Sequence, residues 1–221
     1  MTKSATRTPV WKSIAITLID DIAQGRYETG TKLPAEAQLA ERFGVNRHTV
    51  RRALADMAEQ GLVRVGISMT TLDADLSRRM EPRAPTPARR LAVIRRLSAA
   101  GIPVRVMTSP VVPGLTDHEL EALLAAGAEA GAESASWIML RLPREVSPLF
   151  QEWLAEHYPD RAKRVMTRLR EMHGGQDYSA QWHKRMRGEG PYAAMIAQRF
   201  RAAVKRHGLD APQPELRCDL F

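Results

Sequence analysis

Four basic residues and one threonine gather within six positions of a single predicted helix. In the sequence RHTVRR, the residues on the outward side of this helix are Arg47, His48, Thr49, Arg51 and Arg52. Guanidinium groups pair with phosphates or with O6 and N7 of guanine, and a helix N-terminus itself attracts phosphate. These residue types at this spacing favour contact with a nucleic acid. The alternative that composition leaves open is a three-helix module with a solvated basic face.

Three helices are expected to position these side chains. On the first helix, apolar residues recur at helical spacing, namely Trp11, Ile14, Ala15, Leu18, Ile19 and Ile22. A short second helix over residues 35–43 ends at Gly44, and Asn46 stands at the N-cap position of the third. The residues expected to face inward from the third helix are Val50, Ala53, Leu54 and Met57. Two helices joined by a short turn containing glycine form a helix-turn-helix pattern.

The run KLPAEAQLAERFGVNRHTVRRALADMAEQGLV closely resembles the winged-helix DNA-binding domain of GntR-family bacterial transcription regulators. It is most similar to the branch that includes the phosphonate-utilisation repressors. The matching elements are LPAE, LA, GV, TVR, AL and GLV. The resemblance implies that Arg47, Thr49 and Arg51 contact double-stranded DNA, and it defines residues 1–65 as a DNA-binding domain. Many relatives carry an arginine on the second helix where this chain has Ala37, so one backbone contact is in doubt.

The chain departs from that family after GLV. There a basic strand and a glycine-rich turn form a wing that reaches the minor groove, whereas here Val65 leads directly into GISMTTLD. The effector-binding domain is expected to be missing as well. A DNA-binding domain of this kind without its wing loses contacts to the phosphate backbone, so weaker and less specific DNA binding is expected. Because such regulators usually dimerise through the missing domain, a homodimer is left open.

The remaining segment, residues 66–221, alternates predicted strands and helices. The expected strands cover residues 67–70, 104–107 and 137–142, and the last third of the segment is mostly helical. This alternation indicates parallel β/α units. The predicted fold class is therefore α+β, with a three-helix helix-turn-helix head followed by an incomplete, partial TIM-barrel-like β/α segment with extra C-terminal helices. Since such a fragment has an open edge, Trp137 and Met139 are expected to be exposed core residues unless other surfaces cover them.

This segment resembles the C-terminal part of bacterial radical SAM proteins of the branch similar to spore photoproduct lyase. The resemblance lies in ISMTTLDADLSRRMEPRAPTPARR, in VVPGLTD and in RGEGPYAAMIAQRF. It implies that a strand end and a loop help hold S-adenosylmethionine, through Ser68, Thr70, Pro113 and Gly114. Radical SAM chemistry also requires an iron–sulfur cluster held by three cysteines, usually spaced C-x-x-x-C-x-x-C. Cys218 is the only cysteine in the sequence, so neither catalysis nor a retained cofactor is expected, and Cys218 is interpreted as an inert terminal thiol.

Bulk composition narrows the function classes without locating a site. The formal net charge is +8 and the sequence pI is about 10.1, which favours an anionic partner. No apolar run is long enough to span a bilayer and no signal-peptide pattern begins the sequence, so a cytoplasmic protein without membrane contact is expected. Three hypotheses follow, which are a GntR-type DNA-binding regulator, a radical SAM-like remnant, and a chimeric or truncated reading frame without independent function.

Overall fold

The computed structural model describes residues 8–28, 31–182 and 184–212, and these residues form two compact units. The first contains the described residues as far as Val65, and the second begins at Gly66. Cys218, interpreted above as an inert thiol, lies outside the described residues. No helix within the described ranges is both long and apolar enough to cross a lipid bilayer.

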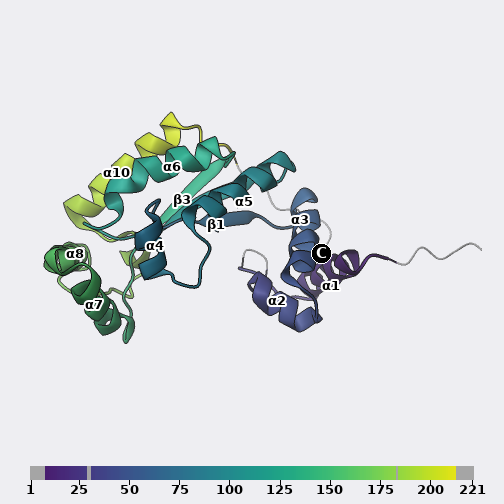
Figure 1. Ribbon diagram of the computed structural model, residues 1–221, viewed down its shortest axis with the longest axis horizontal. Helices are drawn as coiled ribbons and strands as arrows, with labels where there is room; N and C mark the ends of the chain where they lie inside the picture. Colours follow the sequence, from purple (N-terminus) through teal and green to yellow (C-terminus); the bar gives the residue numbers. More distant parts are fainter. Residues whose placement is uncertain (1–7, 29–30, 183, 213–221) are drawn as a thin grey trace, which may run out of the picture. The chain divides into compact units, whose positions relative to one another are not determined.

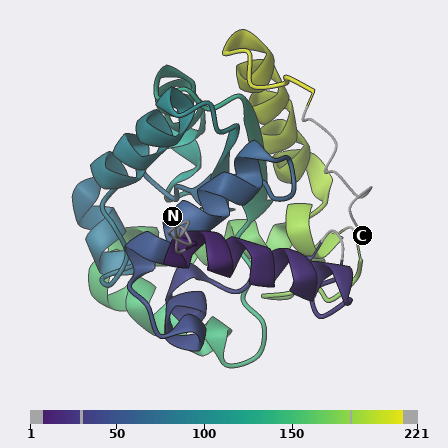
Figure 2. The same ribbon diagram turned by 90° about the vertical axis from the view of Figure 1, so that its right-hand side faces the viewer.

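The first unit is a bundle of three helices (Figures 1 and 2), α1 (Val10–Ala23), α2 (Glu36–Phe43) and α3 (Arg47–Glu59). Its buried core consists of Ile14, Ala15, Leu18, Leu39, Ala40, Val50, Ala53, Met57 and Leu62. These residues are supplied by the apolar faces that helical spacing predicts, so the three-helix head is confirmed. Leu54, expected to face inward, is only partly buried but packs against the same core.

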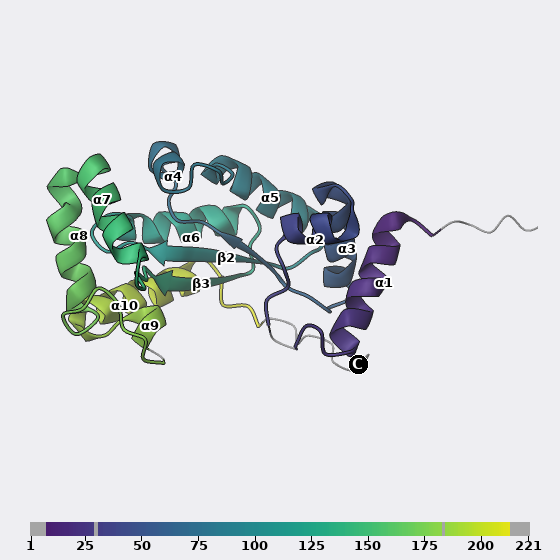
Figure 3. The same ribbon diagram turned by 90° about the horizontal axis from the view of Figure 1, so that it is seen from below.

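The second unit is built on a three-stranded sheet with the order β1-β2-β3, where β1 is Val65–Ser68, β2 is Val104–Val111 and β3 is Ser134–Met139. Strands β2 and β3 are parallel and lie side by side in Figure 3. Their register pairs Arg105 with Ser134 and Thr108 with Trp137, and it shifts between Thr108 and Val111. The sheet confirms the expected mixture of helix and strand, whereas three strands do not close a barrel and the partial-barrel interpretation stays a prediction.

Strand positions differ from those expected at both ends of the sheet. The first strand begins at Val65 rather than Ile67, and the third begins at Ser134 rather than Trp137. Residues 134–136 read SAS, and small polar residues have little strand preference of their own. They are nevertheless paired with β2, because the backbone register fixes them there. Strand propensity alone therefore places the start of this strand too late.

Helices alternate with the strands and then follow them. They are α4 (Ala74–Met80), α5 (Pro87–Ala99), the 3-10 helix η1 (Asp117–Glu119), α6 (Leu120–Glu129), α7 (Val146–His157), α8 (Pro159–Glu171), α9 (Lys184–Arg187) and α10 (Gly190–Arg206). Helices α7 and α8 pack against each other, as do α6 and α10 (Figure 1). The helical character expected for the last third of the chain is confirmed within the described residues.

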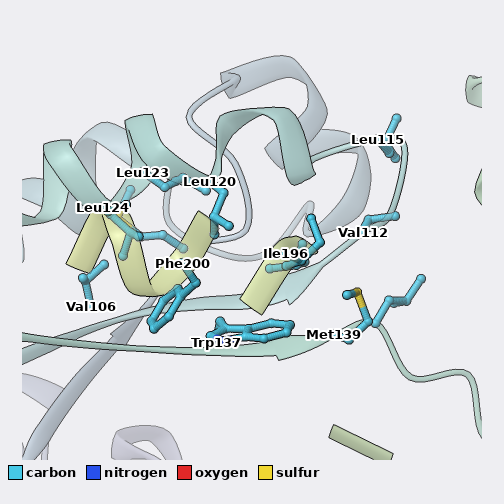
Figure 4. Close-up of a cluster of buried hydrophobic side chains, with 14 of the residues drawn as sticks. Val106, Val112, Leu115, Leu120, Leu123, Leu124, Trp137, Met139, Ile196 and Phe200 are labelled. Atoms are coloured by element: carbon cyan, nitrogen blue, oxygen red, sulfur yellow. The ribbon is translucent and has the colours of Figure 1, made fainter. Parts of the chain in front are cut away.

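The core of the second unit decides one conditional expectation. Trp137 is 2% exposed and Met139 is fully buried, because other surfaces of the unit cover both residues. Figure 4 shows the reason, since side chains from α6 and α10 surround the strand residues. The ring of Phe200 on α10 lies 6.0 Å from that of Trp137, measured between centroids. Helices α6 and α10 thus cover this face of the sheet.

Polar contacts fasten α10 over this core. Arg199 donates to both carboxylate oxygens of Glu121 at 2.7 and 2.6 Å, and this contact lowers the pKa of Glu121. The Tyr192 hydroxyl donates a short hydrogen bond to Asp117, and burial together with this bond raises the pKa of Tyr192 to about 12. These bonds link α10 to the start of α6, so the two helices that bury Trp137 are held as one layer.

Candidate nucleic-acid interface

The turn between α2 and α3 sets the direction in which α3 is presented. Gly44 follows the last residue of α2 with φ of 62°, a left-handed conformation that glycine adopts without steric cost. The amide of Val45 donates to the carbonyl of Ala40 at 3.0 Å, which satisfies an end group of the helix. Asn46 then starts the next helix, so the expected helix–turn–helix is present.

Asn46 caps α3 as its sequence position predicts. Its Oδ1 accepts a hydrogen bond from the amide of Thr49 at 2.9 Å and another from the Thr49 hydroxyl at 3.0 Å. The cap satisfies one of the free amides in the first turn and fixes the turn that carries the basic residues. The hydroxyl of Thr49 is therefore engaged in the cap.

Replacing this cap tests how far the head depends on it. Asn46→Ala is expected to lower the free energy of unfolding of the first unit by about 1 kcal/mol, because the Thr49 amide loses its acceptor. Asn46→Asp keeps an acceptor oxygen and is the matched control. Urea unfolding followed by far-ultraviolet circular dichroism measures the difference. Equal midpoints for all three proteins would show that the cap contributes nothing.

Arg47 and His48 lie at the exposed start of α3. Within the described part of the chain neither side chain forms a hydrogen bond or an ion pair. The positive end of the helix dipole adds to the charge of Arg47, so this turn attracts anions. Of the five predicted residues, these two are the most available to a partner.

Arg51 is held by a carboxylate from the preceding helix. Its Nε donates to Oε1 of Glu36 at 3.0 Å and its Nη2 donates to Oε2 at 2.7 Å, a bidentate pair between α3 and α2. The hydrogen bonds from Glu36 raise the pKa of Arg51. The pair orients the guanidinium plane and leaves Nη1 without a bond to Glu36. Sequence reasoning marked Glu36 as part of the LPAE motif but did not find this pairing.

Arg52 is turned toward the first helix. Its guanidinium lies 4.6 Å from the ring centroid of Trp11 on α1, a cation–π arrangement, although the residue as a whole is exposed. The structure thus divides the five predicted residues. Arg47 and His48 are free of such contacts, whereas Thr49, Arg51 and Arg52 are oriented by Asn46, Glu36 and Trp11.

The family resemblance implies an arginine at the position of Ala37, and the second helix offers no substitute for it. Ala37 is exposed, and the next arginine along α2 is Arg42. Arg42 forms an ion pair with the buried carboxylate of Asp21 at 2.6 Å and donates to the Tyr27 hydroxyl at 2.8 Å. The hydrogen bond to Asp21 raises the pKa of Arg42. Arg42 therefore makes its polar contacts within the first unit.

The segment after α3 does not form a hairpin. Leu62 is buried in the core of the head, and from Val65 the chain enters β1, which neighbours β2 in the sheet. The amide of Met69, one residue beyond β1, donates to the carbonyl of Met107 at 2.8 Å. Within the described segment from Gly61 to Thr70, Val65–Ser68 forms strand β1 of the sheet and does not form a wing hairpin.

The residues predicted for S-adenosylmethionine lie at the ends of β1 and β2. The hydroxyls of Ser68 and Thr70 both donate to the carbonyl of Ser109, at 2.8 and 3.4 Å. Pro113 is buried, and Gly114 has φ of 73° and faces the side chain of Arg164. The two hydroxyls are thus engaged within the sheet. A single cysteine in the whole sequence does not fit the donor set of an iron–sulfur cluster.

Comparisons with known proteins separate the two units. Residues 11–66 match the model of bacterial regulatory proteins of the gntR family. An HTH-type transcriptional regulator of Rhizobium meliloti (strain 1021) is 51% identical over 55 residues, which are 25% of this chain and 22% of that protein. The probable transcriptional regulator PhnF of Escherichia coli (strain K12) is 45% identical over 64 residues, 28% of this chain and 26% of its own.

A longer match reaches an uncharacterised protein of Mycobacterium tuberculosis (strain ATCC 25618 / H37Rv). It is 37% identical over 122 residues, which are 54% of this chain and 35% of that protein, so this chain spans about a third of its length. No solved structure matches the chain. The capped helix, the exposed basic turn and the family match together identify residues 11–66 as a helix-turn-helix domain of the gntR family of bacterial regulatory proteins.

Proposed function

We propose that this chain binds double-stranded DNA as a transcription regulator of GntR type, with the helix at residues 46–60 as its reading element. The observation that carries the proposal is the gntR-family match of a domain whose third helix presents an exposed basic first turn. Duplex DNA is a polyanion, and a recognition helix enters its major groove with N-terminal residues toward the bases. The turn from Arg47 to Arg52 supplies this combination.

Each of the predicted residues has a role that its surroundings favour. Arg47 has its whole guanidinium fork available for a phosphate or a guanine. Arg51 presents Nη1 while Glu36 fixes its plane, so it reads one position in a preset orientation. Arg52, supported by the Trp11 ring, and His48 contribute contacts to the backbone. Thr49 contributes its methyl group and its place in the capped turn.

The binding is expected to be weaker than that of a winged relative. The chain after Gly61 continues into β1, so contacts that a wing makes to phosphates are not provided by this segment. A single head reads one half-site, and a homodimer that placed two heads on one duplex would recover affinity through effective concentration. We include such a dimer in the proposal.

Salt dependence of duplex binding tests the proposal. Retention of a fluorescent duplex of mixed sequence is measured by anisotropy at increasing sodium chloride. With two to four phosphates neutralised, the logarithm of the binding constant is expected to fall with the logarithm of salt with a slope of about −2 to −4. The lowest workable ionic strength provides the strictest condition. A parent protein that fails to bind there would refute the DNA-binding proposal.

The second candidate concerns the β/α unit, residues 66–221, as a radical SAM-like remnant. The alternation of strand and helix and the glycine turn at Gly114 favour it. The absent cysteines exclude an intact cluster site from this sequence. On this view the second unit keeps the fold of an enzyme segment without its chemistry, and a fused or truncated reading frame would produce the same arrangement.

A further inference from the structure

A cluster of arginines on aromatic rings lies where α9 packs against β3 in the second unit. In each stack the guanidinium carbon lies within 6 Å of a ring centroid, with Arg141 over Tyr178 at 5.6 Å, Arg185 over Trp182 at 4.1 Å and Arg187 over Trp137 at 4.4 Å. A guanidinium on a ring is held in position while its charge is not neutralised. The cluster therefore presents oriented positive charge.

Arg141 is partly buried and incompletely bonded. It follows β3 by two residues, and its Nη2 donates to the Tyr178 hydroxyl at 3.1 Å. Its Nη1 lies 3.7 Å from Sδ of Met186, which is a weak acceptor, and its Nε is buried without a hydrogen-bond acceptor. Within the described residues no carboxylate lies at ion-pair distance from this guanidinium.

Arg187, on the neighbouring helix α9, is exposed as a residue and also lacks a carboxylate partner among the described residues. Its guanidinium covers the ring of the buried Trp137, and partial burial lowers the pKa of Arg187. No carboxylate of the described chain is at ion-pair distance from it either. Met186, adjacent to Arg187 in sequence, contacts Arg141, so Arg141 lies against the helix that carries Arg187.

Three other partly buried arginines of the same unit are compensated by carboxylates. Arg90, Arg170 and Arg199 each form an ion pair with a carboxylate, at 2.8, 2.6 and 2.6 Å. Removing a cation from water without such a group is unfavourable, and a bound anion would offset that cost. The partly buried Arg141, which lacks such a group among the described residues, therefore points to an anion supplied from outside this unit.

The position and the donors indicate which anion fits. Arg141 lies beyond the carboxyl end of a parallel strand, the edge at which sheets of this class bind ligands. Tyr178 accepts from Arg141, so its own proton is available for a ligand oxygen. Two cations and one hydroxyl match a doubly charged group with several oxygens better than a single carboxylate. We propose that Arg141, Arg187 and Tyr178 bind the phosphate group of a small phosphorylated molecule.

Calorimetric titration of the full chain with inorganic pyrophosphate tests this site. Arg141→Gln and Arg187→Gln are each expected to weaken binding roughly tenfold, because each removes a charged donor pair. Tyr178→Phe keeps the ring and is expected to weaken binding roughly threefold. Succinate is expected to bind at least about tenfold more weakly than pyrophosphate, since a carboxylate carries less charge at each site.

The controls separate this site from other basic surfaces. Arg95→Gln and Arg96→Gln, both exposed on α5, are expected to leave pyrophosphate binding unchanged. Circular dichroism shows whether Arg141→Gln is folded. If Arg141→Gln is not folded, Arg187→Gln still tests the site. The proposal is overturned if the parent does not bind pyrophosphate, if either control weakens binding as much as Arg141→Gln, or if succinate binds equally well. If a single-stranded oligonucleotide bound more tightly than pyrophosphate and displaced it, the ligand of this site would be a nucleic acid and not a small phosphorylated molecule.

Discussion

The Arg47→Ala/Arg51→Ala double variant is expected to bind duplex DNA about 30-fold or more weakly than the parent chain. Loss of an arginine that contacts a base costs about 1–3 kcal/mol, and every 1.4 kcal/mol is a factor of ten in affinity. Arg47 is the exposed cation of the first turn, and Arg51 is the oriented one. Removing both takes away the strongest donors on the reading face, and fluorescence anisotropy at fixed salt measures the loss.

A control of equal charge makes the result specific. Lys12→Ala/Arg95→Ala also removes two positive charges, but from exposed positions on α1 and α5. This variant is expected to change affinity less than about threefold, since neither residue belongs to the first turn of α3 that is proposed to contact the duplex. If both double variants lost the same affinity, the binding would reflect net charge alone. The reading role of α3 would then be wrong.

Folding of the double variant is not expected to fail. Arg47 has no intramolecular bond in the described chain, and the pair between Arg51 and Glu36 is partly exposed, so its loss costs at most about 1 kcal/mol. The core residues of α3, such as Val50 and Met57, are unchanged and fully buried. A normal circular dichroism spectrum together with lost duplex binding would therefore assign the defect to the surface.

The features of the head that the sequence predicts are local ones. Apolar spacing predicts the buried faces, Gly44 predicts the end of α2, and the side chain of Asn46 bonds an amide three residues away. All of these depend on a few consecutive residues. The pair between Glu36 and Arg51 joins residues 15 apart on two helices, and the stack of Arg52 on Trp11 spans a greater separation. No periodicity encodes such contacts, because the packing angle of the helices decides them.

The second unit shows the same limit at larger scale. Alternation of strands and helices indicates parallel β/α units, and β2 and β3 pair in parallel. What covers the sheet depends on where α10 returns, and nothing near Trp137 in the sequence specifies this. The sequence predicts an exposed Trp137 unless another surface covers it. Phe200 and Arg187, both far along the chain, provide that cover by packing on its ring.

Trp137→Ala is therefore expected to destabilise the second unit by about 3–5 kcal/mol. Truncation of a buried aromatic residue removes its transfer free energy and leaves a cavity that the surroundings fill only in part. Here the cavity would open between β3 and α10, and Arg187 would lose the ring that supports it. Urea unfolding followed by circular dichroism measures the change as a shift of the midpoint.

Trp182→Ala is the matched control, because the same atoms are removed from a residue that is 69% exposed. Its ring also carries an arginine, Arg185, so both variants lose one cation–π contact, worth about 0.5–1 kcal/mol at an exposed site. The difference between the two variants isolates burial. A midpoint shift as small for Trp137→Ala as for Trp182→Ala would mean that α10 does not close over the sheet in solution. In that case Trp137 would be exposed, as the sequence predicts for a sheet face that no other surface covers.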